Sequence, residues 1–368
     1  MLAQRLAAQM LSGPRARAPV AVCERLLAVQ GQDPRGFRLA VRARSEGLTA
    51  ADVDRALDER ALLVTWLNRG TLHLVRAEDY PWLHALTAPR HRTAIMRRLA
   101  QEGVADPDRG VAAIERALAA DGPLPREELR ERVAAAGQRS EGQALIHLLA
   151  LASLRGLVVR GPTDGRQHLY ALVRDWLGEQ PRLDGDAALA ELARRYLAGH
   201  GPAGDRDLAK WAGVTLRDAG AGLRAIAGAL VERGGGLVDL ARRDAAHDPA
   251  TAGPSAAGAR PRGARATSRA AGAPSRGADP PLPPPRLLGA FEPVLLGWAS
   301  RDDVVGPHRD RITVEGLFRS FAMVGGRAVA TWRLDGGDLA IEPLEPIAPA
   351  DAAALDDDAA DVRRFLGV

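Results

Sequence analysis

"ALAADGPLPREELRERVAAAG", residues 117–137, is followed at a constant offset of 79 residues by the similar stretch "YLAGHGPAGDRDLAKWAGVT", residues 196–215. Self-similarity at a fixed spacing is typical of a repeated supersecondary unit. Each copy predicts a helix, a Gly-Pro break, a shorter helix, a glycine and a longer helix. Residues of the two copies that coincide without a gap include Leu118 with Leu197, Gly122 with Gly201, Pro123 with Pro202, and Leu129 with Leu208.

A hairpin is predicted after each copy. "GLVVRGPTDGRQHLYALV", residues 156–173, places two β-rich segments around a turn that contains Gly, Pro and Asp. Three helices followed by a hairpin are the pattern of a winged helix, a helix-turn-helix variant that usually offers its third helix and its wing to DNA. After the second copy the hairpin is reduced to "GGGLVDL", residues 234–240.

The N-terminal segment follows the same plan more loosely. We expect one helix up to about Gln30, another from about Pro34 to Ser45, and a third through residues 50–60 with Thr49 as its cap. "ALLVTWLNRGTLHLV", residues 61–75, then predicts two strands around the turn at Asn68, Arg69 and Gly70. The sequence therefore predicts an α+β protein with three winged-helix units in tandem.

The composition changes beyond the third unit. Residues 242–285 contain Ala, Gly, Pro, Ser and Arg with almost no large apolar residue, which predicts a disordered linker. Residues 319–346 alternate short strands with Gly-Gly turns, as in a small antiparallel meander or β-barrel, and an Asp-rich helix ends the chain as a solvated cap. The expected domains are winged helices at 1–100, 101–180 and 181–241, the linker at 242–285, and a C-terminal β-barrel with an acidic tail at 286–368.

Cysteine content and hydropathy limit the kinds of site and compartment. The chain has 368 residues, a net charge of +4 and a single cysteine, Cys23, which excludes an internal disulfide and a Cys-built metal site. Because the eight histidines lack ligand-like spacing, we expect no metal and no cofactor. No segment resembles a signal peptide, and no apolar run approaches the ~18 residues of a membrane span. We therefore expect a cytoplasmic protein with no membrane partner.

Two groups of arginines could bind phosphates. Arg35, Arg38 and Arg42 follow i, i+3, i+7 spacing and would line one helix face. Residues 80–101 contain no acid, and an ordinary solvated face explains either group as well as phosphate binding does. The basic residues of the acid-free segment are His84, Arg90, His91, Arg92, Arg97 and Arg98.

Two glutamines lie at the junction "LLAVQGQDPRGFR", residues 26–38. Gln30 follows Cys23 and Leu26 on an apolar helix stripe, where an unsatisfied amide costs about 1–3 kcal/mol, so backbone, water or a ligand should bind it. Alternatively, Gln30 caps the helix end while Gln32 lies in a solvated turn. Asp33, followed by a proline, suits a turn or N-cap better than a general base.

The three units, "QGQDP" at 30–34, "LNRGTLHLV" at 67–75 and "LLGAFEPVLLG" at 287–297 together resemble the AlkZ/YcaQ family of bacterial DNA glycosylases. The resemblance implies tandem winged helices that form a concave DNA-binding surface, a C-terminal β-barrel, and excision of N7-alkylated purines, including those in interstrand crosslinks. The family's catalytic motif is Gln, an aliphatic residue, then Gln or Asp. It falls on Gln30, Gly31 and Gln32, and Gly31 departs from the aliphatic position.

This implied chemistry makes two neutral amides plausible. An N7-alkylated guanine is already cationic, so the departing base needs no protonation, and the two amide carbonyls orient water and favour the cationic transition state. The expected partner is double-stranded DNA with alkylated purines or crosslinks, bound by a monomer. The rival class is a non-catalytic winged-helix regulator, although the chain has no evident dimerisation segment. The expected contacts to DNA are Arg35, Arg38, Arg90 and Arg92. Arg69, Thr71 and His73 are expected to contact DNA or to support the Gln pair, although Thr71 and His73 could equally complete strand hydrogen bonds.

Overall fold

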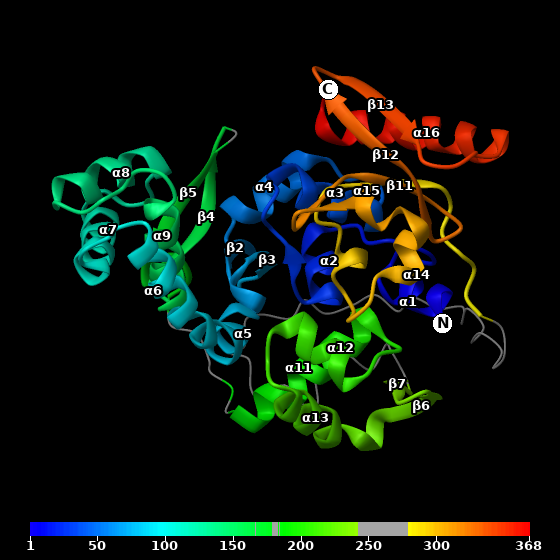
Figure 1. Ribbon diagram of the computed structural model, residues 1–368, viewed down its shortest axis with the longest axis horizontal. Coiled ribbons are helices and arrows are strands. Elements are labelled where there is room, and N and C mark those ends of the chain that lie inside the picture. The colour runs from blue at the N-terminus through cyan, green and yellow to red at the C-terminus, as the bar shows by residue number, and fades with distance from the viewer. Residues whose placement is uncertain (166, 179–182, 184, 242–278) are drawn as a thin grey trace, which may run out of the picture.

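The computed structural model describes residues 1–165, 167–178, 183, 185–241 and 279–368. Within them, three sets of helices, each followed by a β-hairpin, precede a C-terminal region of short strands and one long helix (Figure 1). The predicted mixture of helices and antiparallel sheet is therefore confirmed. The predicted linker lies outside the described residues except for 279–285. No helix in the described ranges is long and apolar enough to cross a membrane.

The first set carries both glutamines, and two of its helices begin at predicted caps. Asp33 precedes α3, and its side chain accepts a hydrogen bond from the backbone N–H of Gly36. Thr49 precedes α4, and both its backbone N–H and its hydroxyl donate to Asp52 at 2.8 Å. The set comprises α1 (Leu2–Ala8), α2 (Pro19–Leu26), β1 (Val29–Gln30), α3 (Pro34–Arg44), α4 (Ala50–Asp58), β2 (Leu62–Trp66) and β3 (Leu72–Arg76).

The first predicted helix ends earlier than expected. α2 ends at Leu26, because Leu27 has a φ of 63°, which lies outside the helical region. The chain then turns into the two-residue strand β1, where Gln30 pairs with His73 of β3. The prediction of a helix up to Gln30, with Gln30 as its cap, is therefore wrong.

The second set is joined to the first through one sheet. Its hairpin adds β4 and β5 to the first three strands in the order β1-β3-β2-β4-β5. The guanidinium of Arg160 lies 5.2 Å from the ring centroids of both Trp66 and Tyr170, which ties the two hairpins together. After the connecting helices α5 (Tyr80–Thr87) and α6 (Arg92–Gln101), the set comprises α7 (Pro107–Asp121), α8 (Arg126–Ala135), α9 (Ala144–Leu154), β4 (Val158–Asp164) and β5 (Gln167–Leu172).

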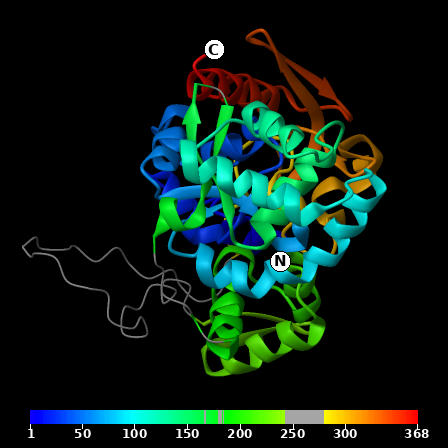
Figure 2. The same cartoon turned by 90° about the vertical axis from the view of Figure 1, so that its left-hand side faces the viewer.

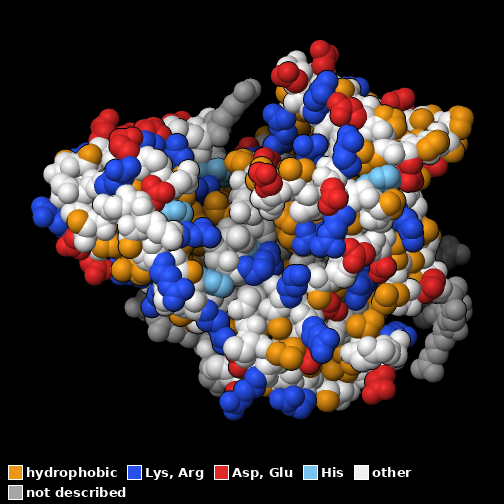
Figure 3. All heavy atoms as spheres, viewed as in Figure 1, with side chains coloured by type: hydrophobic (Ala, Val, Ile, Leu, Met, Phe, Trp, Pro, Cys, Tyr) orange, Lys and Arg blue, Asp and Glu red, His pale blue; other side chains and the backbone are white. Residues whose placement is uncertain are grey.

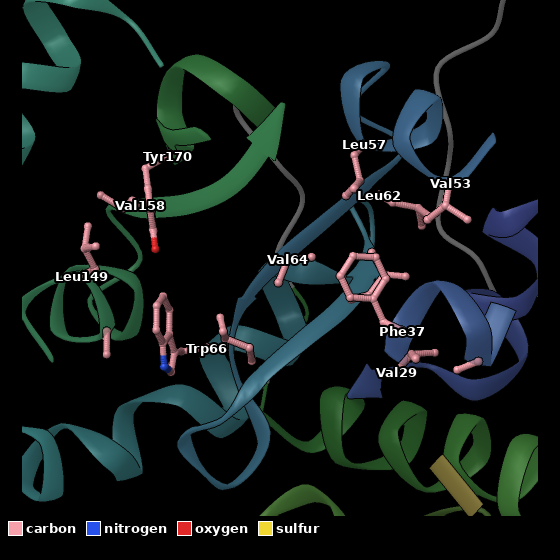
Figure 4. Close-up of a cluster of buried hydrophobic side chains, with 14 of the residues drawn as sticks. Val29, Phe37, Val53, Leu57, Leu62, Val64, Trp66, Leu149, Val158 and Tyr170 are labelled. Atoms are coloured by element: carbon pink, nitrogen blue, oxygen red, sulfur yellow. The ribbon is translucent and has the colours of Figure 1, made fainter. Parts of the chain in front are cut away.

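Apolar side chains from both sets pack along this shared sheet. Figure 4 shows Trp66 between Val64 of the first set and Leu149 of the second. Both aliphatic side chains are at most 1% exposed, and Trp66 is 6% exposed. Because burial of such side chains contributes on the order of 1.5–3 kcal/mol each, the second set is firmly attached to the sheet that holds Gln30.

The third set packs against the C-terminal region. The Tyr196 hydroxyl donates to the carbonyl of Gly297 at 2.8 Å, and the Trp298 indole donates to the carbonyl of His200 at 2.8 Å. Its hairpin is longer than the predicted 234–240, because residues 230–234 form a paired strand. After α10 (Val173–Leu177), the set comprises α11 (Gly185–His200), α12 (Asp205–Ala212), α13 (Leu216–Ala225), β6 (Leu230–Gly234) and β7 (Leu237–Leu240).

The C-terminal region is an open antiparallel sheet. Its order is β13-β12-β11-β8, while β9 (Thr313–Val314) and β10 (Leu317–Phe318) form a separate two-stranded hairpin. Since β13 and β8 remain unpaired edges among the described strands, the predicted closed barrel is wrong. The elements of this region also include α14 (Asp302–Val305), α15 (Arg309–Ile312), β8 (Arg286–Leu288), β11 (Phe321–Val324), β12 (Arg327–Asp335), β13 (Asp338–Pro343) and α16 (Pro349–Leu366).

α16 is a packed helix and not the predicted solvated cap. It buries Leu355 and Phe365, and Figure 2 shows it at the end of the molecule opposite the third set. Arg42 of α3, whose side chain is 1% exposed, donates to Asp358 at 2.9 and 3.0 Å and to Asp361 at 2.9 Å. Arg42 is therefore neither a phosphate contact nor part of a solvated face.

The Arg42 ion pairs predict a large effect on stability. Arg42→Ala would remove the cation of Asp358 and leave Asp361 with Arg364 alone, so we expect the free energy of unfolding to fall by about 3–5 kcal/mol. Arg35→Ala, at an exposed position of the same helix, is the matched control and should change it by less than about 0.5 kcal/mol. Urea unfolding measures both variants, and equal small losses would contradict this role for Arg42.

Candidate active site

Gln30 lies in a chain of hydrogen-bonded side chains. Its amide nitrogen donates to Gln32 Oε1 at 2.7 Å and to Thr71 Oγ1 at 2.9 Å, and its carbonyl oxygen accepts from Arg69 Nη2 at 2.9 Å. A guanidinium has only donors, so the amide must turn its oxygen toward Arg69 and its two N–H groups toward the other partners. These contacts fix the orientation of the Gln30 amide.

A tight turn between β2 and β3 brings Arg69 to Gln30. Arg69 and Gly70 have φ values of 57° and 69°, and two such residues in succession are typical of a type I′ hairpin turn. The left-handed conformation costs an arginine roughly 1–2 kcal/mol. Hydrogen bonds from its guanidinium to Gln30 and to the carbonyl of Trp211, the latter at 2.5 Å, offset this cost.

Gly31 lies between the two glutamines with its backbone against the sheet. Its N–H donates to the carbonyl of Leu72 at 2.7 Å. A Cβ at this position would lie 3.2 Å from both Val64 Cγ1 and the carbonyl carbon of His73, which is closer than ordinary contact distance. The space that an aliphatic side chain would occupy is therefore filled by β2 and β3, and the departure from the family pattern matches this packing.

His73 lies beneath the Gln pair as a neutral ring. It pairs with Gln30 across the strands and is 2% exposed, and its Nδ1 lies 3.0 Å from the carbonyl oxygen of Thr71. Burial, and then the charge of Arg69, lower the pKa of His73 to about 3. Burial, and then the charge of Arg301, lower the pKa of Arg69 to about 10, so Arg69 stays protonated at neutral pH.

The side chains bound to Gln30 include no carboxylate. Asp33, the nearest acid along the chain, instead caps α3. Within the described residues, no group of His, Cys, Asp and Glu side chains could hold a metal ion. The arrangement can therefore orient a water molecule through amide dipoles, but it holds no ionised base against the Gln pair.

The third set and the C-terminal region meet beside Arg69. Gly213, just after α12, packs so closely on Arg69 that a Cβ there would lie 2.8 Å from the Arg69 backbone nitrogen. Lys210 donates to the carbonyl of Ala299 at 3.0 Å, and two residues further on the Arg301 guanidinium lies 4.7 Å from the Phe318 ring centroid. No pattern in the sequence predicts this group, and its one signal is that Lys210 is the only lysine.

The structure does not bring the other predicted arginines to Gln30. Arg38 pairs with Asp54, and Arg90 pairs with Asp218 at 2.5 Å. Arg35 donates to the carbonyl of Leu334 at 3.2 Å and Arg92 to that of Leu154 at 2.9 Å, and both remain exposed. Figure 3 shows Lys and Arg side chains spread over this face, beside the hollow between the second set and the rest of the molecule.

Comparison with known proteins now decides the class of enzyme. The family model described as DNA glycosylase AlkZ-like matches residues 23–365. This chain belongs to the AlkZ-like DNA glycosylase family. It is therefore an enzyme that cleaves N-glycosidic bonds, and the predicted family is confirmed over the rival class of non-catalytic regulators.

Two relatives of this glycosylase come from Streptomyces sahachiroi. The Interstrand DNA cross-link repair glycosylase is 27% identical over 369 residues, which cover 94% of this chain and 90% of that protein. The solved structure of the DNA glycosylase AlkZ has a TM-score of 0.71 at 22% identity, with 100% of this chain and 96% of that chain covered. The likeness to this solved structure supports the fold of the present chain.

The close packing at Gly31 yields a prediction for the glycosylase. Gly31→Val should shift the backbone between the glutamines and slow base release at least tenfold, about 1.4 kcal/mol in the barrier. Gly228→Val is the control, because nothing lies within 4 Å of a Cβ at Gly228. Adding Val64→Ala should restore part of the Gly31→Val rate. Single-turnover base release from alkylated DNA measures these effects, and an unchanged Gly31→Val rate would show that the packing is irrelevant.

Proposed function

We propose that this glycosylase releases N7-alkylated purines from double-stranded DNA, including purines held in interstrand crosslinks, with Gln30 and Gln32 orienting the attacking water. The observation that carries the proposal is the Gln30 amide, fixed by Arg69 and Thr71 and hydrogen-bonded to Gln32. The name of the curated relative, an interstrand cross-link repair glycosylase, supports crosslinks as substrates.

The free lone pairs of the two amides supply the site for water. Gln30 Oε1 accepts one hydrogen bond from Arg69, and Gln32 Oε1 accepts one from Gln30. Because an amide oxygen has two lone pairs, each oxygen can accept one more bond. A water that donates to both keeps its own lone pairs for attack on the anomeric carbon. As the glycosidic bond breaks, the carbonyl dipoles stabilise the positive charge that develops on the sugar.

The leaving group explains why neutral amides suffice. An N7-alkylated purine departs as a neutral base, so no proton has to be delivered to it. His73, with a pKa of about 3, and the cationic Arg69 are poor general acids at neutral pH. Lys210, the only lysine, is engaged by the carbonyl of Ala299. Water, and not a lysine amine, is therefore the nucleophile, which makes the enzyme monofunctional.

DNA binding follows from the three repeated sets. We propose that each set is a winged helix and that the duplex crosses the hollow beside the second set. Arg35 and Arg92, which remain exposed, and Arg301, near Arg69, would bind phosphates. Arg38 and Arg90 would instead hold the protein framework through their acidic partners. One chain supplies the whole Gln site, so a cytoplasmic monomer would suffice for activity.

The test is release of N7-methylguanine from a methylated duplex under single-turnover conditions. Gln30→Ala and Gln32→Ala should each slow release at least tenfold, which corresponds to about 1.4 kcal/mol of transition-state stabilisation. Gln143→Ala, at an exposed glutamine just before α9, is the matched control and should retain the wild-type rate. Circular dichroism and binding to undamaged duplex would verify that all variants are folded.

A second substrate separates a wrong lesion from a wrong mechanism. If the wild type leaves methylated DNA intact, a duplex with an N7-linked interstrand crosslink is tested next. Release from the crosslink that depends on both glutamines would support the proposal. It would be refuted by wild-type rates in both variants, or by no release from either substrate.

A further inference from the structure

α4 directly precedes the hairpin of the first set, which is the place of the third helix in a winged helix, and it is poorly suited to bind DNA. In α4, Asp52, Asp54 and Asp58 are exposed or half-buried, and the cation Arg55 pairs with Asp52 at 2.9 Å. Asp58 also accepts hydrogen bonds from the backbone and hydroxyl of Thr163 in β4, at 2.8 and 3.0 Å. This helix therefore faces the second hairpin, and its one cation, Arg55, is already paired with Asp52, so it offers no unpaired positive charge to phosphates.

The third helix of the second set is inaccessible. α9, residues 144–154, contains no basic residue other than the half-buried His147, and it has no exposed residue. It packs on α6 and on the shared sheet. In this set, the helix that usually contacts DNA in a winged helix is therefore buried in the protein core.

α13 of the third set is the one third helix, among those described, with an exposed basic face. Arg217 and Arg224 are exposed and form no ion pair within the described residues, and they are seven residues apart on the same face. Gly220 and Ala221 lie between them, and the Arg224 side chain lies against Gly220, where a Cβ would be 3.1 Å from its Nη1. The acid of this helix, Asp218, is neutralised by Arg90.

The dimensions of this face fit duplex DNA. Seven residues of an α-helix rise about 10 Å, close to the width of about 12 Å of the major groove. Two arginines at this separation can reach phosphates on either side of the groove. Their charge, without a carboxylate partner, complements the phosphate backbone.

We infer that α13 binds the duplex on one side of the lesion and that the third helices of the other two sets do not serve this purpose. This inference rests on the proposed function. α13 begins three residues after Gly213, which packs against Arg69. Three residues of chain and the ten-residue helix together span less than one turn of DNA, about 34 Å. The packing of Gly213 against Arg69 therefore sets the distance between the Gln pair and the DNA segment that α13 binds.

The test is the salt dependence of binding to an undamaged duplex, measured by fluorescence anisotropy. Arg217→Gln/Arg224→Gln removes two phosphate contacts, so the slope of log K against log salt should become shallower by about 2. Affinity at low salt should fall severalfold. Because undamaged DNA is the probe, this result does not depend on which base the enzyme releases.

A matched control is available on the second set. Arg109 and Arg116 of α7 are also exposed and seven residues apart, so Arg109→Gln/Arg116→Gln removes the same charge with the same spacing. We expect this control to keep the wild-type slope. A wild-type slope in the α13 variant, or equal changes in both variants, would overturn the inference.

Discussion

The proposed Gln30–Gln32 site depends on the way Arg69 is held. Its guanidinium donates to Gln30 in β1 and to the carbonyl of Trp211 at the end of α12, so one side chain joins the first and third sets at the Gln pair. The left-handed turn at Arg69 and the close approach of Gly213 both serve this contact. Hydrogen bonds from charged donors contribute about 1.5–3 kcal/mol, which offsets the burial that lowers the Arg69 pKa to about 10.

The contact with Arg69 fixes the orientation of the Gln30 amide and the direction of its hydrogen bond to Gln32. The cation next to Gln30 Oε1 polarises the amide and makes its N–H groups stronger donors to Gln32 and Thr71, as in other chains of hydrogen bonds. Burial, and then the same cation, lower the pKa of His73 to about 3 and keep its ring neutral. This arrangement supports the proposal that the substrate base already carries a positive charge, since such a base departs without a proton from the protein.

Local signals in the sequence predicted local structure well. Thr49 and Asp33 cap helices as predicted, and the turn around Arg69 and Gly70 joins two strands as predicted. Contacts between distant segments carried no such signal. Gln30 belongs to a strand because the positive φ of Leu27 ends the preceding helix. A leucine side chain gives no sign of that backbone conformation. Arg42 matches the spacing of a solvated face, but α16, more than 300 residues away, covers it. Arg301 also lies near Arg69 through packing between segments that are far apart in the sequence, which no local pattern predicts.

The most direct test of the central claim is a double-mutant cycle between Arg69 and Gln30. The single-turnover rate of base release is measured for Arg69→Met, Gln30→Ala and the combined variant at saturating enzyme. If Arg69 acts by orienting Gln30, the combined variant is no slower than the slower single variant, because the second change removes nothing further. If the two losses multiply, Arg69 acts independently of Gln30, and the account of an amide oriented by Arg69 is contradicted.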